Sequence, residues 1–468
     1  MRPSATLSAA LVALMAVPVV ASAPGLPSTA IVAIAPGARP TFASAQGPAT
    51  TAQCEDLDHF RCYDPAQIQR AYDVEPLFAQ GIDGQGQTII IVDSFGSPTI
   101  KQDLATFDGE FGLPAPPSFT ILQPAGAVPP YKPSPTREGW AGETTLDVEW
   151  SHVMAPGASI LLVETPTSEN EGTSGFPQIE AAEEYVIDHH MGGVISQSFS
   201  ATEETFPSAS ALKALRGAYI DANENGVTVL AASGDSGAAD VDAAGDYYPY
   251  PVTSWPDSDP LVTGVGGTEL TLDGAGNRIR PDVVWNDTYN PAVNIYFTGN
   301  TTPQPDAGGG GLSIIFDRPS YQDSVKDVVG DRRGVPDIAM SGACSGQVNT
   351  YQSFGGQTPG WYIVCGTSEA TPLFAGIVAL ADQAAGHPLG LINPTLYAMS
   401  EYGARGIVDV TSGNNTVTYT QASGTRTIQG FDTLPGFDLA SGVGTIDAAY
   451  FVPELAATDT GADGTASH

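Results

Sequence analysis

The sequence predicts an α/β fold in which a doubly wound, mainly parallel β-sheet carries helices on both faces of a single domain. Short apolar runs such as Thr88–Val92 (TIIIV) are continuous and do not alternate with polar residues, which is typical of strands buried on both faces. Stretches with helical periodicity separate these runs. Hydrophobic residues make up 42% of the 468 residues, which is enough for a sizeable core.

Strands and helices alternate along the chain. The predicted strands are Thr88–Val92, Ser159–Val163, Val194–Ser198 and Val227–Ala232. The predicted helices are Glu143–Met154, Gln178–His190, Ala209–Asn223 with Gly226 as its stop, and a helix running from Ser368 through Leu380. Sites in such folds gather at the carboxyl ends of the strands. This directs attention to Asp93, to Asp235 and to the loop before Ser368.

The two ends of the chain differ from its middle. One basic residue, the apolar run Leu7–Val20 and a small-residue cleavage signal predict a signal peptide at residues 1–21. An Ala/Pro/Ser/Thr-rich lead-in at 22–53 is predicted to be flexible, and a polar tail at 456–468 to be disordered. The folded domain is then expected to span 54–455. Since no later stretch is apolar enough to cross a membrane, the protein is expected to be secreted into the extracellular space.

The charge narrows the classes of partner. The chain has 52 Asp and Glu against 17 Lys and Arg, for a net charge of −35 at pH 7. Nucleic-acid phosphates and anionic lipid surfaces would be repelled, so neither is expected as a partner. Self-repulsion disappears as the carboxylates protonate, so this surface suits an acidic medium.

Export would allow the cysteines to form disulfides. The four cysteines permit alternative pairings, and we expect the nearest-neighbour pairs Cys54–Cys62 and Cys344–Cys365. No Cys/His spacing indicates a zinc site.

The segment Cys365–Gly376 (CGTSEATPLFAG) is the most distinctive in the chain. It predicts a tight turn at Gly366 and a helix opening at Ser368, with Pro372 tolerated in the first turn. A serine there lies near free backbone N–H groups and the positive end of the helix dipole, which suits a nucleophile and an oxyanion. Taken alone, Gly-Thr-Ser is more often an ordinary helix N-cap.

A serine nucleophile needs a base, and histidine is the usual one. None of the six histidines lies in a His-Gly-Thr-His context, so a Ser-His-Asp hydrolase is poorly supported. Carboxylates are better candidates. Glu143 and Asp147 are four residues apart on a predicted helix, about 40° apart around its axis, so they share one face. Two adjacent carboxylates cannot both ionise easily, so one pKa should rise and that group can act as a base in acid. Alone, such a pair is usually a solvated helix face.

The third candidate is Asp235 in Ser233–Gly237 (SGDSG), directly after a buried strand. Such a segment is usually a turn. In acid, however, a protonated Asp235 could donate a hydrogen bond to an oxyanion.

These elements together resemble the sedolisins, the serine-carboxyl peptidases with a subtilisin-like fold. The resemblance covers roughly residues 63–450. It rests first on Gly142–Asp147, Ser233–Gly237 and Gly366–Gly376. Supporting stretches are Tyr63–Tyr72, Met154–Gly157, Gly310–Ser313, Pro319–Gln322 and Val335–Asp337. Each motif is weak alone, but their order and spacing make the joint match specific.

The resemblance implies a single catalytic domain that hydrolyses peptide bonds as a secreted, acid-active endopeptidase. It makes Ser368 the nucleophile and Glu143 the general base, with Asp147 orienting Glu143 and Asp235 completing the oxyanion hole. Protein or peptide substrates are the expected partners, and the enzyme is expected to be a monomer. The preferred substrate side chains, and the choice between internal cutting and tripeptide release, are left open.

The resemblance also implies one structural Ca²⁺ ion near the C-terminus. The positions that match its ligands are Asp409, Val410, Leu434, Gly436 and Asp438. Two carboxylates with backbone carbonyls suit a hard cation. Without the resemblance, both segments would be interpreted as turns.

Several features depart from the family pattern. Sedolisins usually carry a long N-terminal prodomain, whereas only about 30 residues separate the predicted leader from Cys54, so this chain is expected to lack one. Asp93 and Phe199 stand where some members have Glu and Trp, and Glu369 follows the nucleophile where small residues are commoner. A non-catalytic secreted protein and a Ser-His-Asp subtilase are the alternatives. The complete set of four catalytic residues disfavours the first.

Overall fold

A computed structural model describes residues 47–458 of the chain. The predicted leader at 1–21, most of the predicted lead-in and the tail from 459 onward lie outside the described residues. No described helix has the length and apolar character needed to cross a membrane.

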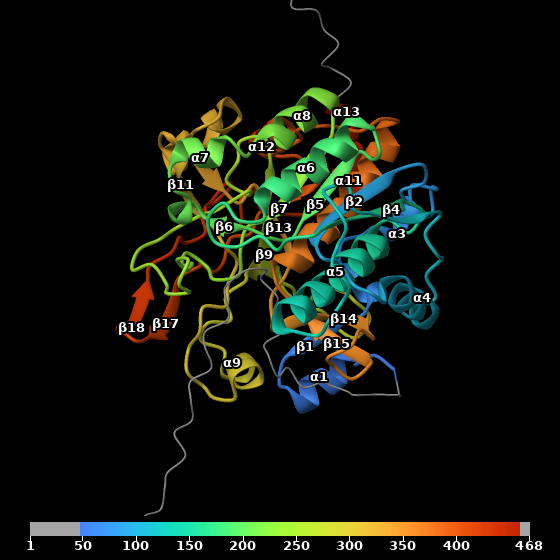
Figure 1. Ribbon diagram of the computed structural model, residues 1–468, viewed down its shortest axis with the longest axis horizontal. Coiled ribbons are helices and arrows are strands. Elements are labelled where there is room, and N and C mark those ends of the chain that lie inside the picture. The colour runs from blue at the N-terminus through green and yellow to red at the C-terminus, as the bar shows by residue number, and fades with distance from the viewer. Residues whose placement is uncertain (1–46, 459–468) are drawn as a thin grey trace, which may run out of the picture.

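The described chain alternates between helices and strands (Figure 1). The helices are α1 Thr51–Leu57, α2 Pro65–Ala71, α3 Glu75–Phe78, α4 Ile100–Phe111, α5 Pro135–Met154, α6 Phe176–Asp188, α7 Ala209–Lys213, α8 Gly217–Asn225, α9 Pro291–Thr298, α10 Lys326–Val329, α11 Thr367–Ala385, α12 Asn393–Tyr402 and α13 Ala448–Thr458. The strands are β1 Arg61–Tyr63, β2 Thr88–Ser94, β3 Phe119–Leu122, β4 Ser159–Thr165, β5 Val194–Gln197, β6 Ala201–Thr202, β7 Thr228–Ala232, β8 Ser254–Trp255, β9 Thr263–Glu269, β10 Val283–Val284, β11 Gly311–Asp317, β12 Arg332–Val335, β13 Ile338–Ser341, β14 Gly346–Gln352, β15 Gly360–Val364, β16 Ile407–Val408, β17 Val417–Gln421, β18 Gly424–Ile428 and β19 Thr445–Ile446.

The main sheet has the order β10-β9-β7-β5-β2-β4-β3, with β13 also pairing with β9. Its strands run parallel except β10, which pairs antiparallel at one edge. The predicted mainly parallel sheet is therefore confirmed. Parallel pairing gathers the carboxyl ends of β2, β5 and β7 at one edge, where sites form in such sheets.

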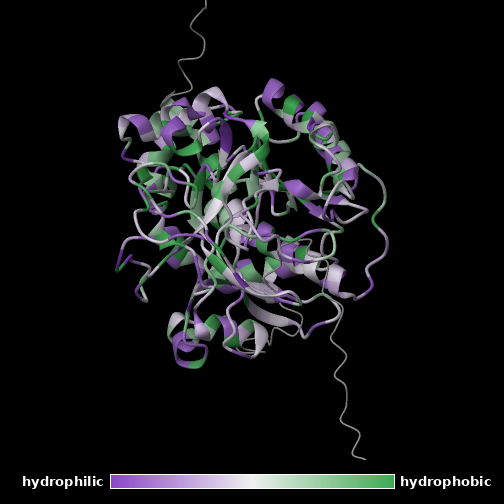
Figure 2. Ribbon diagram, turned by 90° about the vertical axis from the view of Figure 1, so that its left-hand side faces the viewer, coloured by the Kyte–Doolittle hydropathy of each residue, from purple (hydrophilic) through white to green (hydrophobic). Residues whose placement is uncertain are grey.

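Helices cover both faces of this sheet. On one face, α11 packs across β5, β7 and β9 and against α5. On the other face, α6 contacts β2 and β4, and α8 contacts β7. Strand β2 packs into the core on both faces of the sheet. Ile89 and Ile91 belong to one buried cluster, while Ile90 and Val92 belong to the other. Hydrophobic colour accordingly follows the central strands in Figure 2.

One predicted helix is wrong. The segment expected as a single helix at Ala209–Asn223 forms α7 and α8, with a break before Gly217. The break results from a contact with another helix. Glu180 of α6 accepts a hydrogen bond from the backbone N–H of Ala218 at 3.1 Å, and this side chain satisfies an N–H group at the start of α8. A Cβ at Gly217 would lie 2.5 Å from a carboxylate oxygen of Glu184. The predicted stop at Gly226 is confirmed as a left-handed C-cap.

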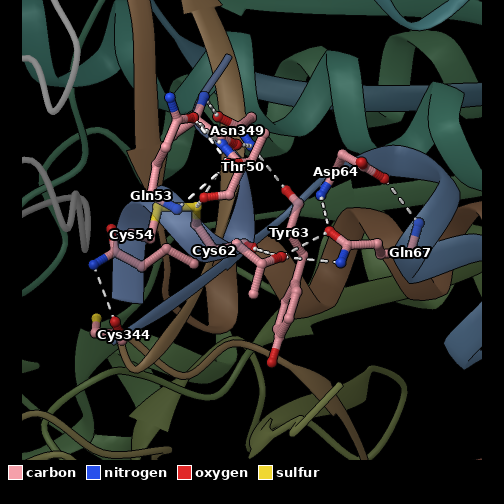
Figure 3. Close-up of a disulfide and its surroundings, with 12 residues drawn as sticks. Thr50, Gln53, Cys54, Cys62, Tyr63, Asp64, Gln67, Cys344 and Asn349 are labelled. Carbon is pink, nitrogen blue, oxygen red and sulfur yellow. Dashed lines mark hydrogen bonds between the residues drawn. A yellow bond between two sulfur atoms is a disulfide. The ribbon is translucent and has the colours of Figure 1, made fainter. Parts of the chain in front are cut away.

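The predicted domain boundaries also need correction. Helix α1 begins at Thr51, inside the segment predicted as flexible lead-in, and Thr50 closes a capping box with Gln53 (Figure 3). Ala49 exchanges backbone hydrogen bonds of 3.0 Å with the side chain of Asn349, which builds this end into the domain. At the other end, residues 456–458 belong to α13 and not to a disordered tail.

Both predicted disulfides are confirmed, Cys54–Cys62 and Cys344–Cys365. The first joins α1 to β1, as Figure 3 shows. The second links the segment after β13 to the end of the β15 segment, three residues before Ser368. The turn that leads into α11 is therefore covalently fixed to the core.

Candidate active site

Ser368 lies in the first turn of α11 and is 1% exposed. The turn before it depends on Gly366, whose φ is +123°. A Cβ at this position would lie 2.6 Å from Oδ2 of Asp235, so any other residue would collide with that carboxyl. The backbone N–H of Gly366 donates to the carbonyl of Gly342 at 2.8 Å, which anchors the turn. The glycine thus permits close approach of the Asp235 carboxyl to the start of α11.

The two predicted carboxylates come from α5, which packs alongside α11. A Cβ at Gly376 of α11 would lie 2.5 Å from the Cβ of Met154 of α5, so this glycine lets the helices approach closely. Glu143 and Asp147 are 2% and 0% exposed. The Ser368 hydroxyl forms a hydrogen bond with the Glu143 carboxyl. The nucleophile and base predicted from the sequence are therefore in contact.

Asp147 continues the cluster away from Ser368. Its Oδ1 accepts a 2.9 Å hydrogen bond from the hydroxyl of Ser198, which lies just after β5. Its Oδ2 has no hydrogen-bond partner among residues 47–458. Asp93 at the end of β2 is also fully buried and interacts electrostatically with both α5 carboxyls. The cluster therefore holds several carboxyls and no cation.

Burial raises the pKa of Glu143 well above its usual range, and Asp93 and Asp235 raise it further. Burial likewise raises the pKa of Asp147, with added repulsion from Asp93 and Glu143. For Asp93, burial raises the pKa to about 7. Each of these groups therefore binds a proton more tightly than an exposed carboxyl does, and ionising one disfavours ionising the next, so a single ionised carboxyl is the state from which the cluster can act as a base. Such a cluster can accept the Ser368 proton and later return it.

Asp235 follows β7, as predicted, and faces the turn before Ser368. Its Oδ1 accepts hydrogen bonds from the backbone N–H of Thr367 at 2.7 Å and from the Thr367 hydroxyl at 2.8 Å. Its Oδ2 has no hydrogen-bond partner among the described residues. Burial raises the pKa of Asp235 to about 7. In acid this carboxyl is neutral and can donate a hydrogen bond.

Sequence reasoning did not assign a role to two residues that belong to this site. Ser198 stands at the end of the predicted strand Val194–Ser198, and its hydroxyl is the one that holds Asp147. Glu169 is 0% exposed and raises the pKa of Glu143, although it comes from the loop after β4. Its neighbours in sequence are ordinary loop residues, so no local signal points to it.

Phe199 and His152 lie away from the reacting groups. The Phe199 ring packs against the rings of Trp140 and Phe176, with centroids 6.4 and 6.2 Å away. His152 of α5 is buried, with its Nε2 2.7 Å from the carbonyl of Pro114 and 3.5 Å from the Asp108 carboxyl. Nine residues separate it from Glu143, which places it on the opposite side of the helix.

The positions that matched a calcium site lie together. Asp409 accepts a 3.0 Å hydrogen bond from the backbone N–H of Gly436. Asp438, 0% exposed, accepts one of 3.1 Å from the N–H of Leu434 and others from the segment that follows it. The donors available from this set are all oxygens, as a hard cation prefers. No group of three or more His, Cys, Asp or Glu suited to a metal occurs within the described chain, so backbone carbonyls such as that of Val410 would have to complete the site.

Glu369 directly follows Ser368 and is 0% exposed. Neither of its carboxylate oxygens makes a well-formed hydrogen bond with a described residue. Burial raises the pKa of Glu369 well above its usual range, and the nearby Asp235 adds to this. An acid of this kind is tolerated in the core only in its neutral form.

Glu369→Gln is expected to make the protein more resistant to neutral pH. The folded state holds the Glu369 proton above the pH at which the unfolded chain releases it, so its contribution to stability is complete in acid and disappears as pH rises. Glutamine stays neutral throughout. The Tm of the variant minus that of the unsubstituted protein should therefore be larger at pH 7 than at pH 4, by on the order of 2 °C or more.

Glu224→Gln provides the control, because Glu224 is an exposed glutamate on α8. This change should leave the difference in Tm between the two pH values as it is. A Glu369→Gln variant whose Tm follows that of the unsubstituted protein at both pH values would mean that Glu369 does not titrate in this range.

The sequence model of the subtilase family matches residues 139–424. Kumamolisin from Bacillus sp. (strain MN-32) is 33% identical over 392 residues, which cover 82% of this chain and 62% of kumamolisin. Human tripeptidyl-peptidase 1 is 30% identical over 325 residues, covering 66% of this chain and 50% of that protein. The chain thus spans between half and two thirds of the length of these relatives.

A solved structure of Pseudomonas sedolisin, described as a serine-carboxyl proteinase complexed with two molecules of pseudo-iodotyrostatin, is similar to this fold. It superposes with a TM-score of 0.70 at 25% identity, covering 87% of this chain and all of that one. The predicted subtilisin-like architecture is confirmed by this likeness.

Proposed function

Since this chain belongs to the subtilase family, we propose that it is a serine-carboxyl peptidase of the sedolisin type that cuts within peptide chains in acid. The observation that carries the proposal is the hydrogen bond between Ser368 and Glu143 inside a cluster of buried carboxyls. Similarity to kumamolisin and to Pseudomonas sedolisin supports the same reaction class. Protein or peptide substrates follow from this chemistry.

The proposed reaction starts at the Ser368 hydroxyl. Its oxygen attacks the carbonyl carbon of the substrate while Glu143 takes the proton. The negative oxygen of the tetrahedral intermediate accepts a hydrogen bond from protonated Asp235, which its bonds to Thr367 hold in place. Glu143 then gives the proton to the leaving amine as the peptide bond breaks. Water repeats the sequence on the acyl-enzyme and releases Ser368.

Asp147 is proposed to assist as a positioning residue. Its contact with Ser198 fixes it one helical turn beyond Glu143, and its electrostatic interaction with Glu143 couples their protonation. While Asp147 holds its proton, Glu143 is the site where a negative charge costs least. The pair can therefore take up and return one proton without leaving two charges in the core.

Digestion of an unfolded protein across the pH range tests the proposal. We expect activity at pH 3–5 that declines through about pH 7, where Asp235 ionises and can no longer donate. The products should be internal fragments, and the Ser368→Ala variant should yield none. Activity that instead rises through pH 6–7 would indicate a histidine base and contradict the carboxyl mechanism. Release of tripeptides alone would contradict internal cutting.

Secretion and a monomeric state complete the proposal. Secretion is inferred from the apolar run at Leu7–Val20 and the small-residue cleavage signal after it. The charge of −35 at pH 7 favours separate molecules in neutral solution. Separation of cell and medium fractions tests the first, and light scattering of the purified protein tests the second.

One structural calcium ion is proposed at Asp409 and Asp438, with the carbonyls of Val410, Leu434 and Gly436. Bound to the folded state alone, it would stabilise the domain by about 2.7 kcal/mol at a hundredfold excess over Kd. Calcium should therefore raise the Tm of chelator-treated protein at pH 6. Asp409→Asn should remove this response, whereas Asp432→Asn, at an exposed acid of the neighbouring loop, should keep it. A Tm unaffected by calcium in the unsubstituted protein would exclude the site.

A further inference from the structure

A pocket of about 190 Å³ opens between α9 and Asp235. The lining residues used below are Asp235, Trp285, Val293, Phe297, Thr298 and Asp306. Its position relates it to the reaction centre in two ways. Asp235 holds Thr367, the neighbour of the nucleophile. Cys344, also in the lining, is bonded to Cys365, three residues before Ser368.

The apolar wall of the pocket is part of the packed interior. Trp285 and Val293 are 0% and 1% exposed and belong to the buried cluster around both disulfides. The Trp285 indole N–H donates to Asp287 at 3.1 Å, and the same carboxylate accepts from the backbone N–H of Ser345 at 2.8 Å. These bonds join the segment before α9 to the segment that carries Cys344. The wall is therefore preformed and does not depend on a mobile loop.

Helix α9 is held equally firmly on this wall. Asn290 caps its first turn through a 3.1 Å bond from the N–H of Ala292. Asn294 donates to the carbonyls of Thr288 and Asn290, both at 3.0 Å, which fixes the helix to the preceding loop. The helix also packs through Tyr296 against the buried Phe60, with ring centroids 5.2 Å apart. Thr298, at the exposed end of α9, forms the rim.

We propose that this pocket receives a large aromatic side chain of the peptide substrate, within two residues of the bond that is cut. This inference rests on the proposed function and specifies its substrate preference. A cavity of about 150 Å³ lined by apolar side chains holds benzene, so the space here suits a phenyl, phenol or indole ring. Phe297, which is only partly buried, offers an aromatic ring to the occupant, and this favours aromatic partners over aliphatic ones of similar size.

The polar part of the lining determines what the pocket rejects. It contains the carboxyls of Asp235 and Asp306, and no Lys, Arg or His is among the lining residues. A substrate carboxylate would therefore lose its water without gaining a cation, which disfavours acidic side chains. Burial raises the pKa of Asp306 well above its usual range, and repulsion from Asp287 and Asp235 adds to this, so its neutral form can donate to a phenol oxygen.

Peptides that differ at one position test the pocket. In a common neutral background, each position within two residues of the cleaved bond is set in turn to Phe, Tyr, Leu, Ala or Glu at pH 5. At one of these positions, kcat/KM should be at least about tenfold higher for Phe or Tyr than for Ala, and lowest for Glu. Thr298→Trp should fill the mouth and reduce the Phe-to-Ala ratio to about two or less.

Ile295→Trp is the matched control, because Ile295 lies on the same helix, is 51% exposed and does not line the pocket. It should preserve the Phe-to-Ala ratio. Thermal unfolding of both variants shows that they are folded. Equal cleavage of all peptides, or a Thr298→Trp variant with the full aromatic preference, would overturn the inference.

Binding to Ser368→Ala separates this inference from the proposed function. The same Phe, Ala and Glu peptides are titrated against this variant, and isothermal titration calorimetry gives their affinities. Tighter binding of the Phe peptide, abolished by adding Thr298→Trp, would support the pocket even if the unsubstituted protein cleaved nothing. Binding without aromatic preference would overturn the pocket even if cleavage were normal.

Discussion

Ser368→Ala is expected to lower kcat on peptide substrates by about 10⁴- to 10⁶-fold. The Ser368 hydroxyl contacts Glu143 inside a buried cluster of carboxyls. Removing the oxygen removes the atom that forms the acyl-enzyme. What remains is acceleration of direct attack by water through oxyanion stabilisation and substrate positioning. Single-turnover measurements on an internally quenched peptide would give the residual rate.

Glu143→Gln should reduce kcat to a similar extent, because the nucleophile and its base act as one unit whose losses do not add. The double variant with Ser368→Ala should therefore be hardly slower than either single one. Glu149→Gln is the control: Glu149 lies on the same helix and is 0% exposed, but it faces the backbone N–H of Tyr351. It should retain activity. Near-normal turnover in Glu143→Gln would contradict the assignment of the base.

Asp235→Ala is expected to cost about 10²- to 10³-fold in kcat, as loss of an oxyanion donor does elsewhere. Asp235→Asn should keep much of the activity, since an amide also donates a hydrogen bond. The pH dependence distinguishes the two. Burial raises the pKa of Asp235 to about 7, so the wild-type donor is present below that pH and is lost as pH rises through it. The amide donates at every pH, so the alkaline limb should move upward in Asp235→Asn.

The pH–kcat profile of Asp235→Asn needs a reference variant, because burial also raises the pKa of several other carboxyls. Glu149→Gln serves again, since burial also raises the pKa of Glu149 although it lies outside the reacting group. Its alkaline limb should coincide with that of the unsubstituted enzyme. An unshifted limb in Asp235→Asn would assign the loss of activity to another group of the cluster.

Much of this fold could be predicted from local patterns. The continuous apolar run at Thr88–Val92 and the helical stretch ending at Met154 both correspond to elements of the structure, β2 and α5. The four-residue spacing of Glu143 and Asp147 predicted a shared face, and the disulfides follow nearest neighbours. These features succeed because each is determined by a few adjacent residues, whose spacing alone sets the side-chain directions.

The environment of these residues depends on contacts between distant parts of the chain. Ala49 joins the domain through Asn349, 300 residues away in sequence, which composition around the lead-in does not reveal. The break between α7 and α8 likewise depends on Glu180 of another helix. The same holds for the pocket beside α9, which forms where segments distant in sequence meet.

The acids illustrate the division most clearly. Local sequence patterns are enough to show which carboxyls lie on a helix face or directly after a strand. The structure decided that Glu143, Asp147 and Glu369 are all fully or nearly fully buried, that Asp235 is held by Thr367, and that Glu169 joins them from a loop. A pKa depends on desolvation and on charges that arrive from other elements, and neither is encoded in the residues next to the group. Hence the chemistry of this site was predictable as a set of residues, while its working pH depends on how the chain packs around them.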